Sequence, residues 1–482
     1  MISGVIQKSL SWSLFAEVSA KLIVPVSTMI LARLLVPEDF GVLAICNMVV
    51  SFADIITDAG FGKYLIQHDF NDDDEKIKSA NVAFWSNFSL SVLAFLIVFV
   101  NRRSLAELLG NSAYSNVIVV SSIQLIFTSL SSIQTSLLRR NFDYKKLFFV
   151  RIVVSLLPLV VAVPVALLTK SYWALILGNL SGTIGCAILL TIISDWKPKM
   201  FYSFQLLKKM FGFSFWSLCE GVGHWTIFWI DTFIVSKFFS EYYVGIYKNS
   251  ANVVMSLFGI VSASMSPVLL SSLSRLKNDK NDFFGLFIAL QRFLSYVVIP
   301  MGIGLYFFRD LATMVMFGSQ WTEASNVIGA WGLMMMVSVL FYTFVAEIYK
   351  SRGVPKILFL SQILYLLFLL PVCCVSANYG FWTMVYARCL CVFFQVVINV
   401  LILKFYFSYN SLNMFSNILK PLMASIVIVI LGMLANYNNS IEYQLFLLLV
   451  TVVIYFVVLY VWFKNDILAI WNKIHNYKII NE

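Results

Sequence analysis

The sequence predicts an all-α polytopic membrane protein, and three observations support this fold class. Hydrophobic residues make up 60% of the 482 positions and charged residues only 12%. The mean hydropathy is +0.86, whereas soluble globular chains are about 45–50% apolar and about 25% charged. The apolar residues also gather in segments of about 20, the length that crosses a bilayer as a helix. This pattern leaves no room for a soluble domain of ordinary size.

About fourteen apolar segments are long enough to span a membrane. They lie near 10–34, 40–66, 79–101, 114–138, 147–169, 172–194, 211–238, 243–270, 283–308, 323–349, 356–377, 379–404, 416–436 and 443–463. Prolines inside four of these segments predict bent or broken helices. These are Pro25, Pro158, Pro164, Pro267 and Pro300. The mildly polar start of the chain runs directly into the first segment, so we expect an uncleaved signal.

The distribution of positive charge between the segments predicts the orientation of the chain. If the N-terminus is cytoplasmic, the cytoplasmic side holds 22 Lys and Arg residues and the opposite side holds 6. Because cytoplasmic loops carry the excess of Lys and Arg, both termini are predicted to be cytoplasmic and the number of spans to be even. The net charge of +10 therefore reports membrane topology, and no nucleic-acid partner is expected.

Several motifs that would indicate an enzyme or a metal site are missing. The seven cysteines all lie in predicted spans without zinc or disulfide spacing, which is typical of apolar packing. The acidic run Asn71–Glu75 falls in a loop of about a dozen residues and is expected to be solvated. The chain has no G-x-x-x-x-G-K-[ST] motif, so it has no ATPase of its own. We expect neither catalytic residues nor a bound metal.

The chain contains an internal repeat with an offset of about 204 residues. The matches are Ser11 with Ser214, Glu17 with Glu220, Lys21 with His224, Arg33 with Lys237, Gly41 with Gly245, and 47–51 with 252–256. Six spans separate the copies, so both copies have the same orientation, as in parallel transporter repeats. The repeat predicts an N-terminal six-helix lobe over 1–200 and a second over 201–410. Residues 411–482 then supply two additional helices and a cytoplasmic tail.

The first copy also resembles a known family. Residues 31–41 read LARLLVPEDFG and residues 52–62 read FADIITDAGFG, with an echo, YVGIY, at 243–247. These stretches are similar to the start of Wzx-type polysaccharide-transport flippases, colanic-acid branch, of the multidrug/oligosaccharidyl-lipid/polysaccharide superfamily. The resemblance implies two six-helix lobes around a central cavity, with alternating access and two additional C-terminal helices.

The resemblance also implies a function, which is the transfer of a lipid-linked sugar across a membrane. The expected substrate is an undecaprenyl-diphosphate-linked oligosaccharide, moved from the inner to the outer leaflet of the bacterial inner membrane. Such units feed O-antigen, capsule or exopolysaccharide synthesis, so a polysaccharide polymerase and assembly proteins are the expected partners. No cofactor is implied, and coupling to H⁺ or Na⁺ stays open.

Ionisable residues inside the apolar segments are the candidate site residues. On insertion scales each costs about 2.5–3.5 kcal/mol at the bilayer centre, so such groups face a wet cavity or a partner. The cations that suit a diphosphate are Lys21, Lys248, Arg292 and Arg388. The groups that suit a coupling ion or a polar cavity wall are Glu17, Asp54, Asp58, Glu220, His224 and Asp231. For each of them, a purely structural interhelical pair is the alternative, and Glu17 and Lys21 have the i,i+4 spacing of such a pair.

Three other functions compete with the flippase hypothesis. A multidrug cation antiporter of the same superfamily predicts a carboxylate-rich cavity and usually twelve spans, whereas this chain has internal basic residues and about fourteen. A polysaccharide polymerase or ligase predicts a large outward loop rich in Arg and His, but the longest outward loop, near 101–116, is short and has no His. A peptidoglycan-precursor flippase shares the whole architecture, and only its substrate separates it.

Overall fold

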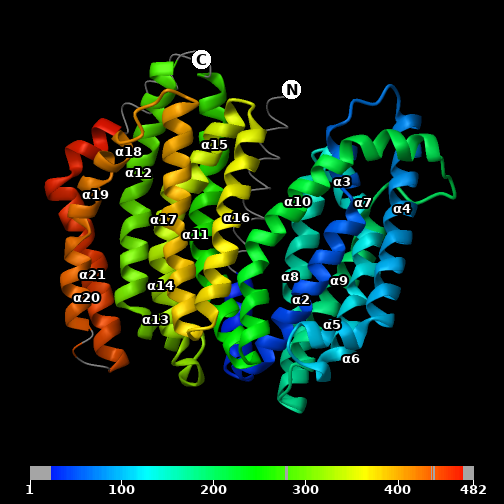
Figure 1. The fold of residues 1–482 in the computed structure, drawn as a ribbon, viewed down its shortest axis with the longest axis horizontal. Coiled ribbons are helices and arrows are strands. Elements are labelled where there is room, and N and C mark those ends of the chain that lie inside the picture. The colour runs from blue at the N-terminus through cyan, green and yellow to red at the C-terminus, as the bar shows by residue number, and fades with distance from the viewer. Residues whose placement is uncertain (1–22, 277–279, 436, 438–439, 471–482) are drawn as a thin grey trace. The chain divides into compact units, whose positions relative to one another are not determined.

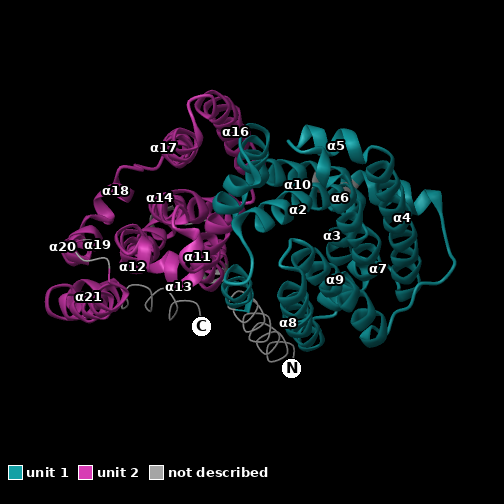
Figure 2. Cartoon of the chain, turned by 90° about the horizontal axis from the view of Figure 1, so that it is seen from below, with its two compact units in different colours: residues 1–248 teal, residues 249–482 magenta. Residues whose placement is uncertain are grey.

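The computed structural model describes residues 23–276, 280–435, 437 and 440–470, and within these ranges the chain forms helices and short turns without a strand. The chain divides into two compact units, residues 1–248 and 249–482 (Figure 2). The boundary between these units lies inside α11 (Glu241–Arg275). The lobes predicted from the repeat, which divide near residue 200, stay a prediction.

The first unit is built from helices that run alongside one another (Figure 1). After a helix over Ile23–Ala32, they are α2 (Pro37–Asp58), α3 (Phe61–Gln67), α4 (Asp73–Val100), α5 (Arg102–Leu108), α6 (Ser115–Ser122), α7 (Gln124–Arg140), α8 (Tyr144–Thr169), α9 (Trp173–Ile193), α10 (Phe204–Phe238) and the start of α11. In this unit α9 packs against α8 and α7, and α10 packs against α2 and α3.

The second unit continues from α11 with a similar side-by-side arrangement (Figure 1). Its helices are α12 (Lys280–Phe307), α13 (Arg309–Met316), α14 (Ala324–Ser338), α15 (Phe344–Ser351), α16 (Pro355–Ala377), α17 (Phe381–Phe405), α18 (Asn413–Asn417), α19 (Leu419–Ala424), α20 (Ile426–Ala435) and α21 (Ile441–Trp462). Here α12 packs against α14 and α20, and α17 packs against α14 and α16.

The predicted all-α membrane fold is confirmed, but the predicted count of fourteen spans is not. Ten helical stretches in the described residues are long and apolar enough to cross a bilayer, and a pair bent by 47° near Ser425 makes up to eleven. The two 35-residue helices α10 and α11 are not among them. Most of the first predicted segment lies outside the described residues.

The second predicted segment is not one continuous helix. Ala59 and Gly60 adopt left-handed conformations, with φ of 44° and 77°, and they separate α2 from α3. Glycine adopts this conformation without the steric cost that a Cβ brings. Two residues after Gly60, a Cβ on Gly62 would lie only 2.7 Å from the hydroxyl of Ser136 on α7. The break therefore lets α3 turn away from α2 and pack closely on a neighbouring helix.

Small residues let α8 and α9 approach closely. Gly178 and Gly182 form a G-x-x-x-G pair on α9, the pattern that brings membrane helices together. A Cβ on Gly178 would lie 2.9 Å from the carbonyl oxygen of Pro158, and one on Gly182 would lie 2.9 Å from the Pro158 ring. Pro158 and Pro164 both lie within the uninterrupted α8, so neither proline breaks this segment, and a bend there stays a prediction.

The N-terminal ends of α2 and α11 cross at two glycines that correspond in the repeat. A Cβ on Gly41 would overlap the carbonyl oxygen of Glu241, and a Cβ on Gly245 would overlap the carbonyl oxygen of Pro37. Both pairs of equivalent positions, 37 with 241 and 41 with 245, are separated by 204 residues. The contact is therefore reciprocal between the two copies, which supports the register of the repeat.

A π-helical turn, Val339–Thr343, joins α14 to α15. Such turns free backbone carbonyl groups from the regular helical pattern. Gln291 donates to the carbonyl oxygen of Leu340 at 3.3 Å, and Asn399 donates to that of Phe341 at 3.3 Å. Asn399 also accepts a hydrogen bond from the Tyr349 hydroxyl at 2.9 Å. Asn399 on α17 thus supports an irregular neighbouring helix.

Candidate functional site

Polar side chains of α2, α3 and α10 lie along helices that pack on one another. We call Asp54, Asp58, Lys63, Glu220 and His224 the α2–α10 cluster. Lys63 and Glu220 form an ion pair with 3.1 Å between Nζ and Oε2, and both side chains are at least half exposed. Asp54 and Asp58 lie one turn apart on α2 and are partly buried. His224 follows Glu220 by one turn of α10 and is exposed.

Tight packing of α10 on α2 positions this cluster. The indole N–H of Trp225 donates to the Ser51 hydroxyl at 2.9 Å, and its ring lies 4.7 Å from that of Phe52. Gly221 faces α2, where an added Cβ would lie 3.2 Å from Ile55. The cluster therefore combines three carboxyl groups, one lysine and one histidine on a well-packed helix pair. Its carboxyl groups can hold a proton, and the Lys63–Glu220 pair is exposed to solvent.

A second polar group is buried between α10 and the start of α11. The Asp231 carboxylate accepts hydrogen bonds from the Tyr247 hydroxyl at 2.9 Å and from the Thr232 backbone N–H at 2.7 Å. Lys248 donates to the carbonyl oxygen of Phe228 at 3.1 Å. Its Nζ also lies 3.8 Å from the Phe228 ring centroid and 3.9 Å from that of Trp229, within the range of cation–π attraction.

In the second unit, Arg388 on α17 is buried among aromatic and sulfur-containing side chains. It is 7% exposed, and its Nη1 donates to the Tyr365 hydroxyl at 2.9 Å and approaches the Met334 sulfur at 3.6 Å. The guanidinium carbon lies 5.5 Å from the ring centroid of Trp331. Such contacts hold a guanidinium group in one orientation, which favours planar recognition of a phosphate.

Arg292 on α12 belongs to a different environment, with partners from the C-terminal part of the chain. Its Nη1 lies 3.2 Å from Oδ1 of Asp466, which also accepts from Lys420 at 2.5 Å. The Tyr296 hydroxyl donates to the other oxygen of Asp466 at 2.9 Å. Arg292 also donates to the carbonyl oxygen of Asn417 at 3.2 Å. We call Arg292, Tyr296, Lys420 and Asp466 the Asp466 cluster.

The structure brings together some predicted site residues and separates others. Asp54, Asp58, Glu220 and His224 share the α2–α10 cluster, whereas Asp231 is buried further along α10. Lys248, Arg292 and Arg388 occupy three separate environments. Glu17 and Lys21 lie outside the described residues.

Sequence reasoning missed three partners of these groups, namely Lys63, Tyr365 and Asp466. The available signal for Lys63 was a basic residue directly after the motif at 52–62, inside a predicted span. Tyr365 and Asp466 carried no such signal, because they lie 23 and 174 positions from the arginines that they contact.

Comparison with known proteins assigns the family. Residues 30–326 match the family described as polysaccharide biosynthesis protein. The chain belongs to this family. The match covers both α2 and the α10–α11 region, and therefore includes the first-unit groups described above. The predicted resemblance to polysaccharide-transport proteins is confirmed.

Individual relatives of this chain share 17–25% of their residues with it over the matched regions. The succinoglycan biosynthesis transport protein ExoT of Rhizobium meliloti (strain 1021) is 25% identical over 73% of this chain and 71% of its own length. An uncharacterized membrane protein in the cps region of Klebsiella pneumoniae is 23% identical over 65% of this chain and 64% of its own. The lipopolysaccharide biosynthesis protein WzxC of Escherichia coli (strain K12) is 17% identical over 66% and 64%.

Solved structures of transporters share the fold of this polysaccharide biosynthesis protein. Lipid II flippase MurJ in an inward closed conformation matches with a TM-score of 0.75 and 15% identity, over 95% of this chain and 100% of that one. An inward-facing multidrug resistance MATE family transporter of the MOP superfamily matches with a TM-score of 0.63 and 10% identity, over 81% and 98%. At these identities the comparison establishes the fold, and it does not choose a substrate.

Proposed function

We propose that this protein is a flippase for undecaprenyl-diphosphate-linked oligosaccharide repeat units in a bacterial inner membrane. It moves them from the inner to the outer leaflet by alternating access, for synthesis of O-antigen, capsule or exopolysaccharide. The observation that carries this proposal is the family match over residues 30–326. The names of the relatives ExoT and WzxC, a transport protein and a lipopolysaccharide biosynthesis protein, agree with it. A polysaccharide polymerase and assembly proteins are the proposed partners.

Deletion of the gene in its native host tests the proposal. We expect loss of the surface polysaccharide and accumulation of undecaprenyl-linked repeat units on the cytoplasmic side, both reversed by the gene supplied in trans. The strain must lack related flippases, so that none substitutes. Normal surface polysaccharide without accumulation in such a strain would contradict the proposal. Rescue of a strain depleted of its lipid II flippase would instead indicate a peptidoglycan precursor as substrate.

We propose two separate candidates for contact with the diphosphate, Arg388 in the second unit and Lys248 in the first, and each is argued from its own surroundings. Tyr365 orients the Arg388 guanidinium, and the rings of Phe228 and Trp229 hold the Lys248 ammonium. Low local dielectric strengthens the attraction of such cations for a phosphate. Lys21, outside the described residues, stays a proposed third contact.

The variants Arg388→Lys and Lys248→Gln test these contacts. We expect both to lower export while the amount of protein in the membrane is kept. Arg388→Lys retains the charge but loses the planar fork that matches a phosphate. Wild-type export by both variants would remove these residues from the proposed site.

For energy coupling we propose the α2–α10 cluster as the site of a bound H⁺ or Na⁺. Its three carboxyl groups exceed its one lysine, and the Lys63–Glu220 pair is exposed enough to open. Reconstituted protein should flip a lipid-linked sugar faster under a pH or Na⁺ gradient, and Asp54→Asn should remove that dependence. Flipping by wild-type protein that ignores both gradients would contradict coupling. It would leave the flippase proposal intact.

A further inference from the structure

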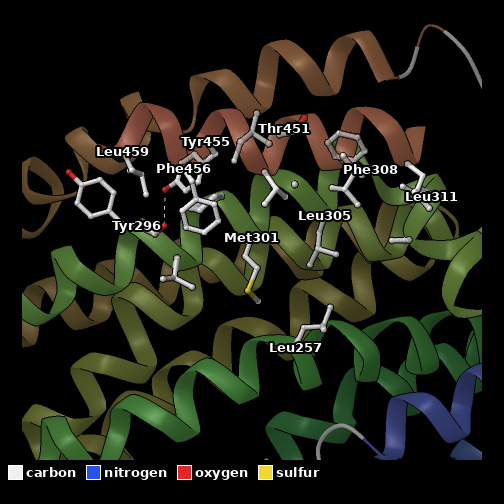
Figure 3. Close-up of a pocket in the computed structure, with 18 of the residues that line it drawn as sticks. Leu257, Tyr296, Met301, Leu305, Phe308, Leu311, Thr451, Tyr455, Phe456 and Leu459 are labelled. Carbon is white, nitrogen blue, oxygen red and sulfur yellow. Dashed lines mark hydrogen bonds between the residues drawn. The ribbon is translucent and has the colours of Figure 1, made fainter. Parts of the chain in front are cut away.

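The second unit contains an apolar cavity of about 770 Å³, a volume typical of ligand pockets. Its walls come mainly from α12, α13 and α21 (Figure 3). Tyr296, Tyr455, Phe456 and Leu459 gather at one end, and Leu305, Phe308 and Leu311 lie toward the other. All of these residues belong to the second unit, so the cavity is a property of that unit alone.

The hydroxyl groups on the cavity wall are already used within the protein. Tyr455 donates to the carbonyl oxygen of Tyr296 at 2.7 Å, and Thr451 donates to that of Leu447 at 2.7 Å. Tyr296 donates to Asp466 at 2.9 Å. A polar occupant would lose its hydration without gaining these donors, whereas an apolar chain loses nothing. The wall therefore selects a hydrocarbon.

The Asp466 cluster lies at the aromatic end of the cavity. Tyr296 belongs to both, and the cavity-lining Phe293 and Ile467 are the sequence neighbours of Arg292 and Asp466. The side chains of Arg292 and Lys420 are 29% and 51% exposed, so each can contact a ligand. One carboxylate shared by two cations leaves a charge of +1. That charge complements a monoanionic group next to a hydrocarbon chain.

We propose that this cavity binds an anionic phospholipid of the bilayer. Its phosphodiester contacts Lys420 and Arg292, and one acyl chain lies between α12 and α21. Lys420 lies at the start of the thirteenth predicted span, 416–436, at the end that is predicted to be cytoplasmic, so the headgroup belongs to the cytoplasmic leaflet. A phosphodiester carries one negative charge, which matches the residual +1, whereas a diphosphate carries more. The ligand is a resident lipid and not the transported cargo, and the inference goes beyond the proposed flippase function.

One glycine on the cavity wall offers a position at which a larger side chain can fill the cavity. Gly304 lines it, and a Cβ added there has no other atom within 4 Å. The first atom of a new side chain is therefore accommodated at position 304, and Gly304→Leu extends an isobutyl group from the cavity wall. Leucine also favours a helix more than glycine does. Gly212 on α10, in the other unit, has equally open surroundings. Gly212→Leu is the matched control for the same change of residue.

The headgroup is tested by removing one charge. Lys420→Gln leaves the Arg292–Asp466 pair in place and takes the cluster from +1 to zero. Lys464, whose Nζ lies 4.8 Å from the Tyr460 ring centroid, is a nearby cation outside the cluster. Lys464→Gln therefore controls for the loss of a positive charge in the same part of the chain.

The experiment is native mass spectrometry of the full-length protein in detergent, titrated with dioleoyl phosphatidylglycerol or dioleoyl phosphatidylcholine. We expect one phosphatidylglycerol to bind in preference to phosphatidylcholine. Lys420→Gln should weaken phosphatidylglycerol binding about tenfold, because it removes a charge-assisted hydrogen bond, and should leave phosphatidylcholine unchanged. Gly304→Leu should weaken the binding of both lipids. Both control variants should bind like the wild type.

Three results would overturn this inference. Equal binding of phosphatidylglycerol and phosphatidylcholine would mean that the Asp466 cluster does not distinguish their headgroups. Unchanged binding by Gly304→Leu at a wild-type melting temperature would place the lipid elsewhere. Displacement of phosphatidylglycerol by undecaprenyl phosphate, with the same sensitivity to both variants, would make the cavity a cargo site. Each readout is independent of polysaccharide export, so failure here is distinguishable from failure of the flippase proposal.

Discussion

Buried ionisable side chains in this protein are held mostly by hydroxyl groups, aromatic rings and backbone carbonyls. Asp231, 2% exposed, relies on Tyr247 and on its neighbour Thr232, and Lys248 relies on two rings and a backbone oxygen. A buried charge without such partners is costly, which makes each partner energetically important. The residues that accompany a charge should therefore be as sensitive to substitution as the charge itself.

Substitution of Tyr247 tests this at a single atom. Tyr247→Phe removes the hydroxyl that donates to Asp231 at 2.9 Å and should cost about 1–3 kcal/mol, because a buried acceptor loses a donor. The melting temperature in detergent should fall, and it should fall further than in Tyr379→Phe, a control at a residue that is 76% exposed. Equal melting temperatures of the two variants would show that Asp231 does not depend on this bond.

The Lys63–Glu220 pair should behave differently, because both side chains are at least half exposed. A double-mutant cycle with Lys63→Gln and Glu220→Gln should give a coupling energy of about 0.2–1 kcal/mol, as for other exposed pairs. The coupling energy is obtained from the free energies of unfolding of the wild type, the two single variants and the double variant in the same detergent. A much larger coupling would indicate that the pair is structural, and it would argue against its opening during transport.

The partners of single residues were the part of the site least accessible from the sequence. Helical spacing identifies neighbours on one helix, such as Glu347 and Lys350, which form an ion pair at 3.0 Å. It cannot identify Asp466 as the partner of Arg292, since 174 positions separate them. The contact depends on how α12 meets the end of the chain, and that packing is set by tertiary structure.

At the scale of the helix, the length of the apolar segments predicted most helices. It did not predict local irregularities of the backbone. The segment predicted over 40–66 reads as one apolar run, yet Ala59 and Gly60 divide it. The π-helical turn after α14 likewise leaves no mark in hydropathy. Both features depend on single backbone angles and on side chains from other helices, such as Gln291 and Asn399. The G-x-x-x-G pair at 178 and 182 was a readable signal for the packing of α9 on α8.

The crossing of α2 and α11 makes a prediction about two small residues. Gly41→Ala or Gly245→Ala would place a methyl group on a backbone carbonyl oxygen, which cannot rotate away as a side chain can. Overpacking of this kind costs about 1–3 kcal/mol, so each variant should lower both the melting temperature and export. Gly212→Ala, with nothing within 4 Å, should match the wild type. Wild-type stability in all three would show that the crossing tolerates a wider spacing.

At the scale of the whole molecule, composition and charge were the strongest predictors. They gave the all-α membrane class, and the motifs near residues 31–62 gave the family that the match over 30–326 confirms. The number of spans was less accessible, because the predicted segments 211–238 and 243–270 fall in α10 and α11, which are not among the ten described stretches long and apolar enough to cross a bilayer. The C-terminal part of the chain also contributes to the core of the second unit. Tyr455 and Ile470 pack with Tyr296 and Ala289 of α12 in one hydrophobic cluster.

The charge bias makes a prediction about the orientation of the whole chain. Since 22 Lys and Arg residues fall on one predicted side and 6 on the other, the C-terminus should be cytoplasmic. A green fluorescent protein fused after Glu482 should fluoresce, and an alkaline phosphatase fused there should be inactive. Phosphatase fusions within 101–116 should be active. The reverse pattern would invert the predicted topology and the proposed direction of transport.

The reciprocal contact of Gly41 and Gly245 also bears on the history of the chain. In an isologous interface, as in a twofold homodimer, residue i of one copy contacts residue j of the other, and residue j of the first contacts residue i of the second. In a homodimer of a single six-helix ancestor, the same glycine would have stood on both sides of the interface. Any substitution of it would have changed both subunits at once. A fusion of two such copies, which the repeat predicts, would let each side vary separately. Under that prediction, Gly41 and Gly245 mark a crossing that requires the same small residue in both copies.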